Sequence, residues 1–387
     1  MIKTIKVMLI PNNKQITKLF QYAGTARFAY NWALAREQEN HENGGKFISD
    51  NDLRKEFTTL KHTDEYAWLN NVSNNVTKQA IKDACESYKR FFKGLSKFPK
   101  YKSKKKSKPS FFQDPVKIKF TDTYVKVEGF AISKKANKQK LNHIRLAEKG
   151  RIPIDCKYYN PRITFDGINW WISVGIDTEE CKCQLNDSGV GIDLGIKDLA
   201  ICSDNNKYKN INKSQTVKNL KKQKRRLQRS ISRSYEKNKK KGKYYKTNNV
   251  IKREKLLLKI NRRLSNIRND YLHQTTTEIV NRKPRFICIE DLNVSGMMKN
   301  KHLSKAIQNQ GFYEFRRQLE YKCKDKGIQL IIAYIFYPSS KLCSCCGNIK
   351  KDLKLSDRIY KCDCGNIIDR DFQASLNLKV YGEQFAS

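Results

Sequence analysis

The segment Val190-Gly191-Ile192-Asp193-Leu194-Gly195 sets one acidic residue inside an apolar run. A run of this kind that ends at glycine predicts a buried strand followed by a turn. Residues 198–202 then predict the second strand of a hairpin. Burying a carboxylate beside apolar side chains is costly unless a positive group shares the site. The segment therefore predicts a hairpin whose carboxylate needs a neighbouring cation.

Two further acids lie at the ends of apolar runs. Glu290 closes an Ile-Cys-Ile-Glu run, and Asp371 lies in an Asp-Arg-Asp sequence. A helical pattern at 312–326 and a strand pattern at 329–336 follow the first run, and this alternation is typical of an α/β layer. A lone acid in such a run is more often an ordinary strand-end residue. Three that converge favour Mg2+ or Mn2+, and two such ions ~4 Å apart could activate water for attack on a phosphodiester.

A second constellation consists of cysteines. Cys343 and Cys346 form one knuckle, Cys362 and Cys364 form another, fifteen residues separate the two, and a glycine follows each. This spacing is typical of a zinc ribbon, in which four thiolates hold a structural ion. The second knuckle is Cys-x-Cys, and Cys345 offers an alternative to either ligand of the first. We expect Zn2+ on the first four.

The composition indicates the class of partner. The 387 residues, enough for two or three domains, include 79 Lys or Arg and 38 Asp or Glu, for a net charge of +41. Nucleic acid is the partner that such an excess favours, and a membrane surface is the weaker candidate. No stretch approaches the ~20 apolar residues of a membrane span, and the first residues lack a secretory segment. We therefore expect a cytosolic protein whose cysteines are thiols or metal ligands.

The region before the first acid predicts an all-β part and a helical part. Residues 1–10 alternate as a strand does, and short β-like runs recur between 116 and 176. Apolar side chains at helical spacing occupy 17–38 and 76–91. We expect a small β-barrel that the N-terminal strand completes, with the helices inserted between its strands.

Two segments concentrate positive charge. Residues 97–108 interleave lysines with aromatic residues and predict a linker lying on phosphates. Residues 213–280 predict two long cationic helices. A solvated surface helix carries such charges too, but these runs flank an acidic strand. The expected phosphate contacts are Lys100, Lys102, Lys104, Lys105, Lys221, Lys222, Lys224, Arg225 and Arg226.

The C-terminal part contains an ordered series of residues. It comprises 338–343, the two cysteine knuckles, the Asp-Arg-Asp sequence, Ala374 and Asn377. This series resembles the TnpB family of insertion-sequence proteins, compact relatives of type V CRISPR effectors, and the resemblance spans nearly the whole chain. It implies three RuvC nuclease motifs whose metal-binding catalytic acids are Asp193, Glu290 and Asp371.

Some positions near the third motif are less settled. Asp369 lies two residues before Asp371 and is a second candidate for the third acid, although the resemblance favours Asp371 at the start of the last helix. The family often has Asn and Ala where this chain has Gln373 and Ser375. That departure still allows metal ligation but puts local packing and full activity in question.

The resemblance also implies the domain plan of an α+β multidomain protein. A wedge β-barrel would carry a helical recognition insertion, and an RNase H-like (RuvC) α/β nuclease domain would carry an inserted zinc ribbon. The implied boundaries are 1–10 with 110–180 for the wedge, 11–109 for the recognition domain, 187–340 with 366–387 for the nuclease, 213–280 for its basic helices, and 341–365 for the ribbon.

By the same resemblance the chain is an RNA-guided DNA endonuclease of a mobile element. It would cleave guide-matched DNA beside a short transposon-adjacent motif by two-metal hydrolysis, using Mg2+ or Mn2+ at the acids and Zn2+ at the cysteines. Its partners would be a guide RNA derived from the element and double-stranded target DNA, with no membrane. Lysines and arginines would hold the RNA–DNA duplex by its backbone while base pairing supplies specificity. We expect a monomer with one RNA.

Three other readings stay open. A nuclease-inactive, RNA-guided repressor would keep the charge and the ribbon, but the loss of an acid would mark it, and all three are present. A strand-transferring transposase would need a recombinase constellation of its own, such as a nucleophilic tyrosine. A type V CRISPR effector is the nearest alternative nuclease, and 387 residues are few for one.

Overall fold

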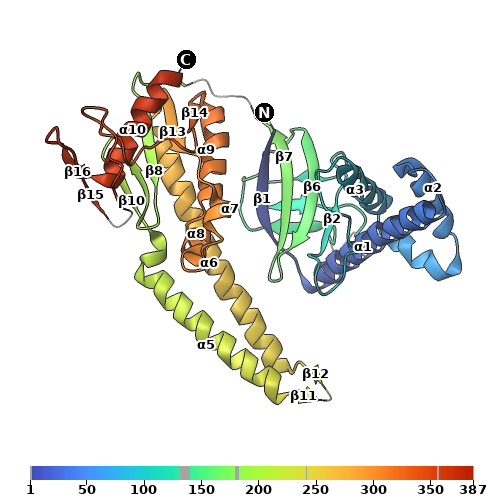
Figure 1. Ribbon diagram of the computed structural model, residues 1–387. Coiled ribbons are helices and arrows are strands. Elements are labelled where there is room, and N and C mark those ends of the chain that lie inside the picture. The colour runs from blue at the N-terminus through green and yellow to red at the C-terminus, as the bar shows by residue number, and fades with distance from the viewer. Residues whose placement is uncertain (1, 131–139, 179–182, 241, 355–356, 387) are drawn as a thin grey trace. The chain divides into compact units, whose positions relative to one another are not determined.

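The computed structural model describes residues 2–130, 140–178, 183–240, 242–354 and 357–386 (Figure 1). The chain divides into two compact units, Met1–Glu179 and Glu180–Ser387. Each combines helices with a β-sheet, which confirms the expected α+β class. Among the helices of the described residues, none contains a stretch long and apolar enough to cross a membrane.

The sheet of the first unit has seven antiparallel strands. Strand β1 lies inside it between β7 and β5, as the alternation of residues 1–10 predicts, and Val7 pairs with Ile172 in its buried middle. The order across the sheet is β2 (Ser110–Phe112), β6 (Tyr158–Phe165), β7 (Trp170–Asp177), β1 (Ile2–Ile10), β5 (His143–Leu146), β4 (Tyr124–Lys126) and β3 (Lys119–Phe120).

The expectation of a closed barrel is wrong. Within the described residues, the outer strands β2 and β3 are not hydrogen-bonded to each other, so the sheet stays open. At the two edges of the sheet, β2 on one side and β4 with β3 on the other are only two or three residues long. Helices α1 and α3 pack against β2 instead, and covering an edge strand with helices is a common alternative to closure.

The segment of chain between β1 and β2 is helical, as predicted. Its helices are α1 (Asn13–Glu42), α2 (Asp50–Leu60), the 3-10 helix η1 (Asp64–Asn71) and α3 (Asn74–Phe92). Asn12 caps α1 in a capping box with Gln15, and the Gln15 amide also donates to the carbonyls of Leu141 and His143. Arg162 of β6 binds both carboxylate oxygens of Asp83 on α3 at 2.7 and 2.8 Å. Helices and sheet thus form one core.

The sheet of the second unit is mixed and has five strands. Its order is β10 (Lys207–Lys209), β9 (Asp198–Cys202), β8 (Val190–Leu194), β13 (Phe286–Glu290) and β14 (Gln329–Ala333). The predicted hairpin is the antiparallel pair β8–β9, and β13 pairs in parallel with both β8 and β14. Helix α10 (Arg370–Phe385) packs on one face, and α6 (Asn248–Asn281) and α9 (Phe312–Lys326) pack with the core of the other. Burial on both faces explains the continuous apolar runs of β8 and β13.

The basic region forms two long helices, as predicted. Helices α5 (Gln215–Lys237) and α6 pack along an apolar seam of Val217, Leu220, Ile260 and Leu264. The remaining elements are η2 (Ile211–Lys213), β11 (Lys239–Lys240), β12 (Lys243–Tyr244), α7 (Val294–Met297), α8 (Ser304–Gln310), β15 (Ile359–Lys361) and β16 (Ile367–Asp369).

Candidate active site and metal centre

The two strand acids are neighbours in the second sheet. Parallel pairing sets Ile289 of β13 opposite Ile192 of β8, so the next position in the register pairs Glu290 with Asp193. Both isoleucines pack in the core beside α6 and α9. Because side chains alternate between the faces of a strand, the two acids project from the opposite face, which α10 covers.

The third acid comes from α10. Asp369 is the N-cap of this helix, and its carboxylate accepts the backbone N–H groups of Asp371 and Phe372, both at 3.1 Å. The residue considered as an alternative third acid is therefore engaged as a helix cap. Asp371 lies in the first turn, where its charge acts on both Asp193 and Glu290.

Gly191 permits the close approach of helix and strand. A Cβ atom at this position would lie 2.1 Å from the carbonyl oxygen of Ser375 and 2.3 Å from the backbone nitrogen of Lys379, both on α10. Contacts that short do not occur, so only glycine lets the α10 backbone lie against β8. Sequence reasoning treated Gly191 as part of a strand motif and missed this role.

The acids share a poorly solvated space. Burial, followed by the charges of Glu290 and Asp371, raises the pKa of Asp193 well above its ordinary value. Burial is also the main cause that raises the pKa of Glu290, with Asp371 adding to the shift and a hydrogen bond from Ser339 opposing it. Like charges in low dielectric hold a proton or a cation between them. The site is suited to binding positive charge.

Two arginines, which sequence reasoning missed, lie beside the third acid. Arg370 Nη2 is 3.2 Å from Asp371 Oδ1, and Arg358 Nη1 is 3.7 Å from Oδ2. The Arg370 charge also opposes the rise in the pKa of Asp193. The Asp-Arg-Asp sequence was the signal available for Arg370. These guanidiniums offset part of the negative charge of the site.

A hydrogen-bonded chain supports Glu290. The Ser339 hydroxyl donates to Glu290 Oε1. Asn377 of α10, fully buried, donates its amide to the carbonyls of Ser339 and Leu342, each at 2.7 Å. Both Ser339 and Asn377 belong to the series of C-terminal residues quoted for the family resemblance, but sequence reasoning assigned a role to neither.

The four predicted cysteine ligands lie together. The Sγ atoms of Cys343, Cys346, Cys362 and Cys364 all lie within 4.8 Å of one another, and two of the separations are 3.6 and 3.5 Å. Zinc–sulfur bonds of ~2.3 Å in a tetrahedron imply separations of about 3.8 Å, so the cluster fits this ion. Cys345 is exposed and lies outside it. In the described part of the chain this is the one group of His, Cys, Asp or Glu side chains whose ligand atoms gather in this way.

Gln373 of α10 links this helix to the cysteine cluster. Its side-chain amide donates to the Leu342 carbonyl at 2.7 Å, and its oxygen accepts from Ser344 at 2.9 Å and from Asn366 at 3.3 Å. Asn366 also donates to Cys343 Sγ at 3.4 Å. At this position, where the family often has Asn, the longer side chain is fully buried and hydrogen-bonded.

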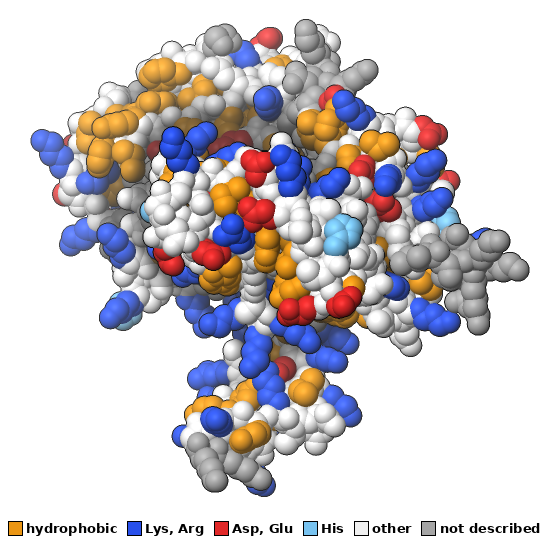
Figure 2. Space-filling model, turned by 90° about the vertical axis from the view of Figure 1, so that its right-hand side faces the viewer, with side chains coloured by type: hydrophobic (Ala, Val, Ile, Leu, Met, Phe, Trp, Pro, Cys, Tyr) orange, Lys and Arg blue, Asp and Glu red, His pale blue; other side chains and the backbone are white. Residues whose placement is uncertain are grey.

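The predicted phosphate contacts occupy two separate regions. Lys222, Arg225 and Arg226 are exposed on α5, and Figure 2 shows Lys and Arg side chains along the α5–α6 hairpin at the bottom of the view. Lys221 and Lys224 are half-buried on the same helix, while Lys100, Lys104 and Lys105 are exposed in the first unit.

Lys102 differs from the other candidates. Its ammonium lies 3.4 Å from the centre of the Tyr30 ring, and burial lowers its pKa. Asn31 of α1 binds both the N–H and the carbonyl of Lys102 at 2.8 Å. This residue fastens the basic segment to α1, which makes it the weakest candidate for a phosphate contact.

Three family models match the chain. Residues 177–301 match one described as "Probable transposase", residues 312–378 match "Cas12f1-like, TNB domain", and residues 1–46 match "Helix-turn-helix domain". In this structure the described part of residues 1–46 consists of strand β1 followed by the single helix α1.

Curated relatives match over nearly the whole length. A protein of Streptomyces pristinaespiralis named "Putative RNA-guided DNA endonuclease" is 30% identical over 383 residues, which cover 98% of this chain and 89% of the relative. A protein of Escherichia coli (strain K12) named "Putative RNA-guided DNA endonuclease InsQ" is 30% identical over 377 residues, covering 93% and 87%.

Solved structures share the fold. The chain of a Cas12f1–sgRNA–target DNA complex superposes with a TM-score of 0.61 at 12% identity, and the match covers 98% of both chains. CasPhi-2 (Cas12j) bound to crRNA gives a TM-score of 0.50 at 9% identity, again over 98% of each chain. These matches show the fold, and the two full-length relatives show that the chain belongs to the TnpB family of insertion-sequence proteins, whose curated members are named as RNA-guided DNA endonucleases.

Proposed function

We propose that this chain is an RNA-guided DNA endonuclease of a mobile element that cleaves guide-matched DNA beside a short adjacent motif. One observation carries the proposal: Asp193, Glu290 and Asp371, from three separate elements, converge at one end of the β8–β13 pair. Full-length relatives bear names that state this activity.

The acids are the proposed holders of Mg2+ or Mn2+. Two carboxylates whose pKa is raised by burial and by the charge of Asp371 fit a site for hard divalent cations. When bound, such ions polarise the phosphate and the attacking water. The chain itself fixes the acids: β8 and β13 hold two in register, α10 brings the third, and Ser339 orients Glu290.

The finer fold assignment follows from this site. We assign 187–340 with 366–387 to an RNase H-like (RuvC) nuclease domain, since its mixed sheet carries the acids. We assign 341–365 to a zinc ribbon, since the four thiols of the cluster fit a tetrahedral ion. Residues 1–10 with 110–180 form the proposed wedge domain, here an open sheet, and 11–109 the proposed recognition domain.

Charge supports the proposed partners, a guide RNA and double-stranded DNA. Helix α5 carries nine Lys or Arg and a single acid, Glu236. The positive side chains on such a helix repel one another, and a bound polyanion relieves that repulsion. Phosphate backbones supply the negative charge without requiring a particular base sequence. The structure of a Cas12f1 chain with the same fold was solved in complex with sgRNA and target DNA. We place the protein with these partners in the cytosol.

The test is DNA cleavage by protein copurified with its native RNA, in Mg2+, on targets with randomised flanks. We expect guide-matched cuts beside a defined motif, lost in Asp193→Ala. Asp291→Asn is the matched control, because Asp291 adjoins Glu290 but pairs with Arg316 at 2.7 Å on the surface. Specific binding without cuts would establish a repressor instead. Absence of RNA from the purified protein would overturn the guided mechanism.

A further inference from the structure

The ends of α1 and α3 in the first unit enclose a hollow of about 730 Å³. Its volume falls within the range of roughly 300–1,000 Å³ that is usual for sites that bind small organic groups. Five aromatic rings line it, and we call the hollow the aromatic pocket. They are Phe47, Tyr88, Phe91, Phe92 and Phe98. Neither the family models nor the predicted site residues assign a role to it.

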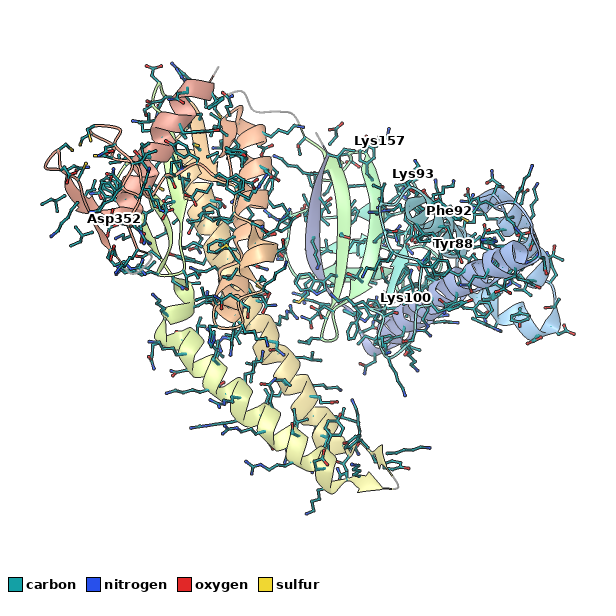
Figure 3. All side chains as sticks on the ribbon, viewed as in Figure 1. Tyr88, Phe92, Lys93, Lys100, Lys157 and Asp352 are labelled. Carbon is teal, nitrogen blue, oxygen red and sulfur yellow. The ribbon has the colours of Figure 1, made fainter. Side chains whose placement is uncertain are left out.

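The rings form a continuous surface. Tyr88 and Phe92, labelled on α3 in Figure 3, stack with centres 6.2 Å apart. Phe98 meets the edges of Tyr88 and Phe91 at 5.7 and 5.2 Å, and Phe47 approaches Phe92 at 6.3 Å. Phe92 is 61% exposed and Phe98 is 46% exposed. Exposed rings gathered around a hollow mark a binding surface rather than a core.

A buried carboxyl group lies in the lining. Glu37 of α1 is 5% exposed. Its Oε2 accepts the backbone N–H of Ile48 at 3.3 Å, but within the described residues its Oε1 has no hydrogen-bond partner. A buried polar atom without a partner is destabilising. A ligand with a donor on one edge would supply the missing bond.

Positive charge surrounds the rings. Lys89 Nζ lies 5.9 Å from the centre of Phe47. Lys93 follows Phe92 directly, as Figure 3 shows, and Lys97 and Lys100 flank Phe98 in an exposed stretch. A flat aromatic ligand with a hydrogen-bond donor and a neighbouring negative charge would match the rings, Glu37 and the lysines. A nucleotide has this combination, because its base stacks while its phosphates bind lysine.

We propose that the aromatic pocket binds an unpaired base of the guide RNA. The base stacks on the exposed rings, its edge donates to Glu37, and the lysines contact flanking phosphates. The RNA identity rests on the proposed function. A pocket already formed in the free protein suits a base that is permanently unpaired, as in the loops and bulges of a folded RNA. The bases of duplex DNA are paired until the strands separate.

The experiment measures nucleic-acid binding by the full chain after its copurified RNA has been removed. The protein is titrated with its native RNA, with a 12-nucleotide RNA of mixed sequence, and with a DNA of the same sequence. Phe92→Ala should weaken both RNAs about tenfold, within the ~5- to 150-fold that loss of one stacked base causes, and Phe92→Trp should restore binding. Leu95→Ala is the matched control, because Leu95 is 68% exposed nearby and does not line the pocket. Thiouridine-substituted native RNA should crosslink to residues 88–98.

Glu37→Gln keeps the side-chain size and the acceptor for Ile48. It should alter the ranking of A, C and U 12-mers more than their mean affinity. Unchanged RNA affinity in Phe92→Ala, in a preparation that still performs guided cleavage, overturns the pocket and leaves the proposed function standing. If Phe92→Ala weakens only the binding of DNA, the occupant of the pocket is DNA and not RNA. If Phe92→Ala abolishes a dimer while the RNA affinity stays the same, the occupant is a second copy of the chain. A wild-type chain that neither retains nor binds RNA overturns both proposals.

Discussion

The acid site and the cysteine cluster are both suited to metal ions, yet the chain builds them in different ways. The cysteines come from two short knuckles within 343–364, and three of the five cysteines in those knuckles are exposed. The acids come from two strands and a helix that are distant in sequence, and packing on both faces of a sheet brings them together. A local site depends on residue spacing, whereas a distributed site depends on how closely whole elements approach.

The largest expected effect concerns the distributed site. Asp193→Asn should reduce guided cleavage by about 10³-fold or more, because it removes one ligand of the proposed two-metal centre. The same change removes a buried repulsion, so the metal-free protein should gain about 1 kcal/mol, or roughly 2–4 °C in Tm. Cleavage assays and calorimetry in buffer without Mg2+ check this prediction. Bound zinc should stay constant, and its loss would show that the two sites are not separate.

Gly191→Ala should disturb the approach of α10 without touching a ligand. The new methyl group must displace the α10 backbone, at a cost of about 3 kcal/mol in the free energy of unfolding. A shift of ~1 Å at the acids can lower activity about 10²-fold. Thermal unfolding and cleavage rates measure both effects. Gly24→Ala in α1 is the control, since its methyl group meets nothing within 4 Å. Equal stability in the two variants would contradict the close packing.

Cys346→Ser should act on the local site first. We expect the loss of one zinc equivalent, measured by atomic absorption, and local unfolding around 341–365 seen by hydrogen exchange. Through Gln373 the disturbance should reach α10 and lower cleavage about 10- to 100-fold. Cys345→Ser, at the exposed cysteine outside the cluster, should retain metal and activity. Zinc loss in the control instead would reassign the ligands.

Ser339→Ala should have a smaller effect. Removing the hydrogen bond to Glu290 leaves the ligand present but less well oriented, and such losses typically cost about tenfold in metal affinity or activity. The Mg2+ concentration for half-maximal cleavage should rise while zinc content stays the same. Ser344→Ala, which removes a bond to Gln373 instead, separates the acid site from the ribbon. An unchanged Mg2+ requirement in Ser339→Ala would argue against orientation of Glu290.

The smallest effect expected is a pH dependence of Mg2+ binding. Burial and the charge of Asp371 raise the pKa of both Asp193 and Glu290, so the folded protein keeps protons there at a pH where the unfolded chain has lost them. As pH rises from about 4 towards the raised pKa values, the metal-free fold loses stability and Mg2+ meets fewer competing protons. Calorimetric titration should show affinity rising with pH, with a flatter profile for Asp193→Asn. A pH-independent affinity would contradict the raised values.

Much of this arrangement could be predicted from the sequence. The apolar runs indicated β8 and β13, the helical spacing indicated α5 and α6, and the cysteine spacing indicated the four thiols that lie together. The open edge of the first sheet could not be predicted, because β2 is covered by helices that come from other parts of the chain. The same limit applies to Gly191, Ser339 and Gln373, since each acts through a partner that is distant in sequence.

The position of α10 in the chain has a consequence for biosynthesis. Residues 370–385 follow the strands that carry Asp193 and Glu290, and they also follow the basic helices α5 and α6. A chain whose translation stopped before residue 370 would contain both strand acids and most of the positive charge, yet it would lack the third acid. On the proposed assignment of Asp371, a growing polypeptide can therefore gather nucleic acid before it can cut any. The order of synthesis then delays cleavage until α10 has been made and packs against Gly191.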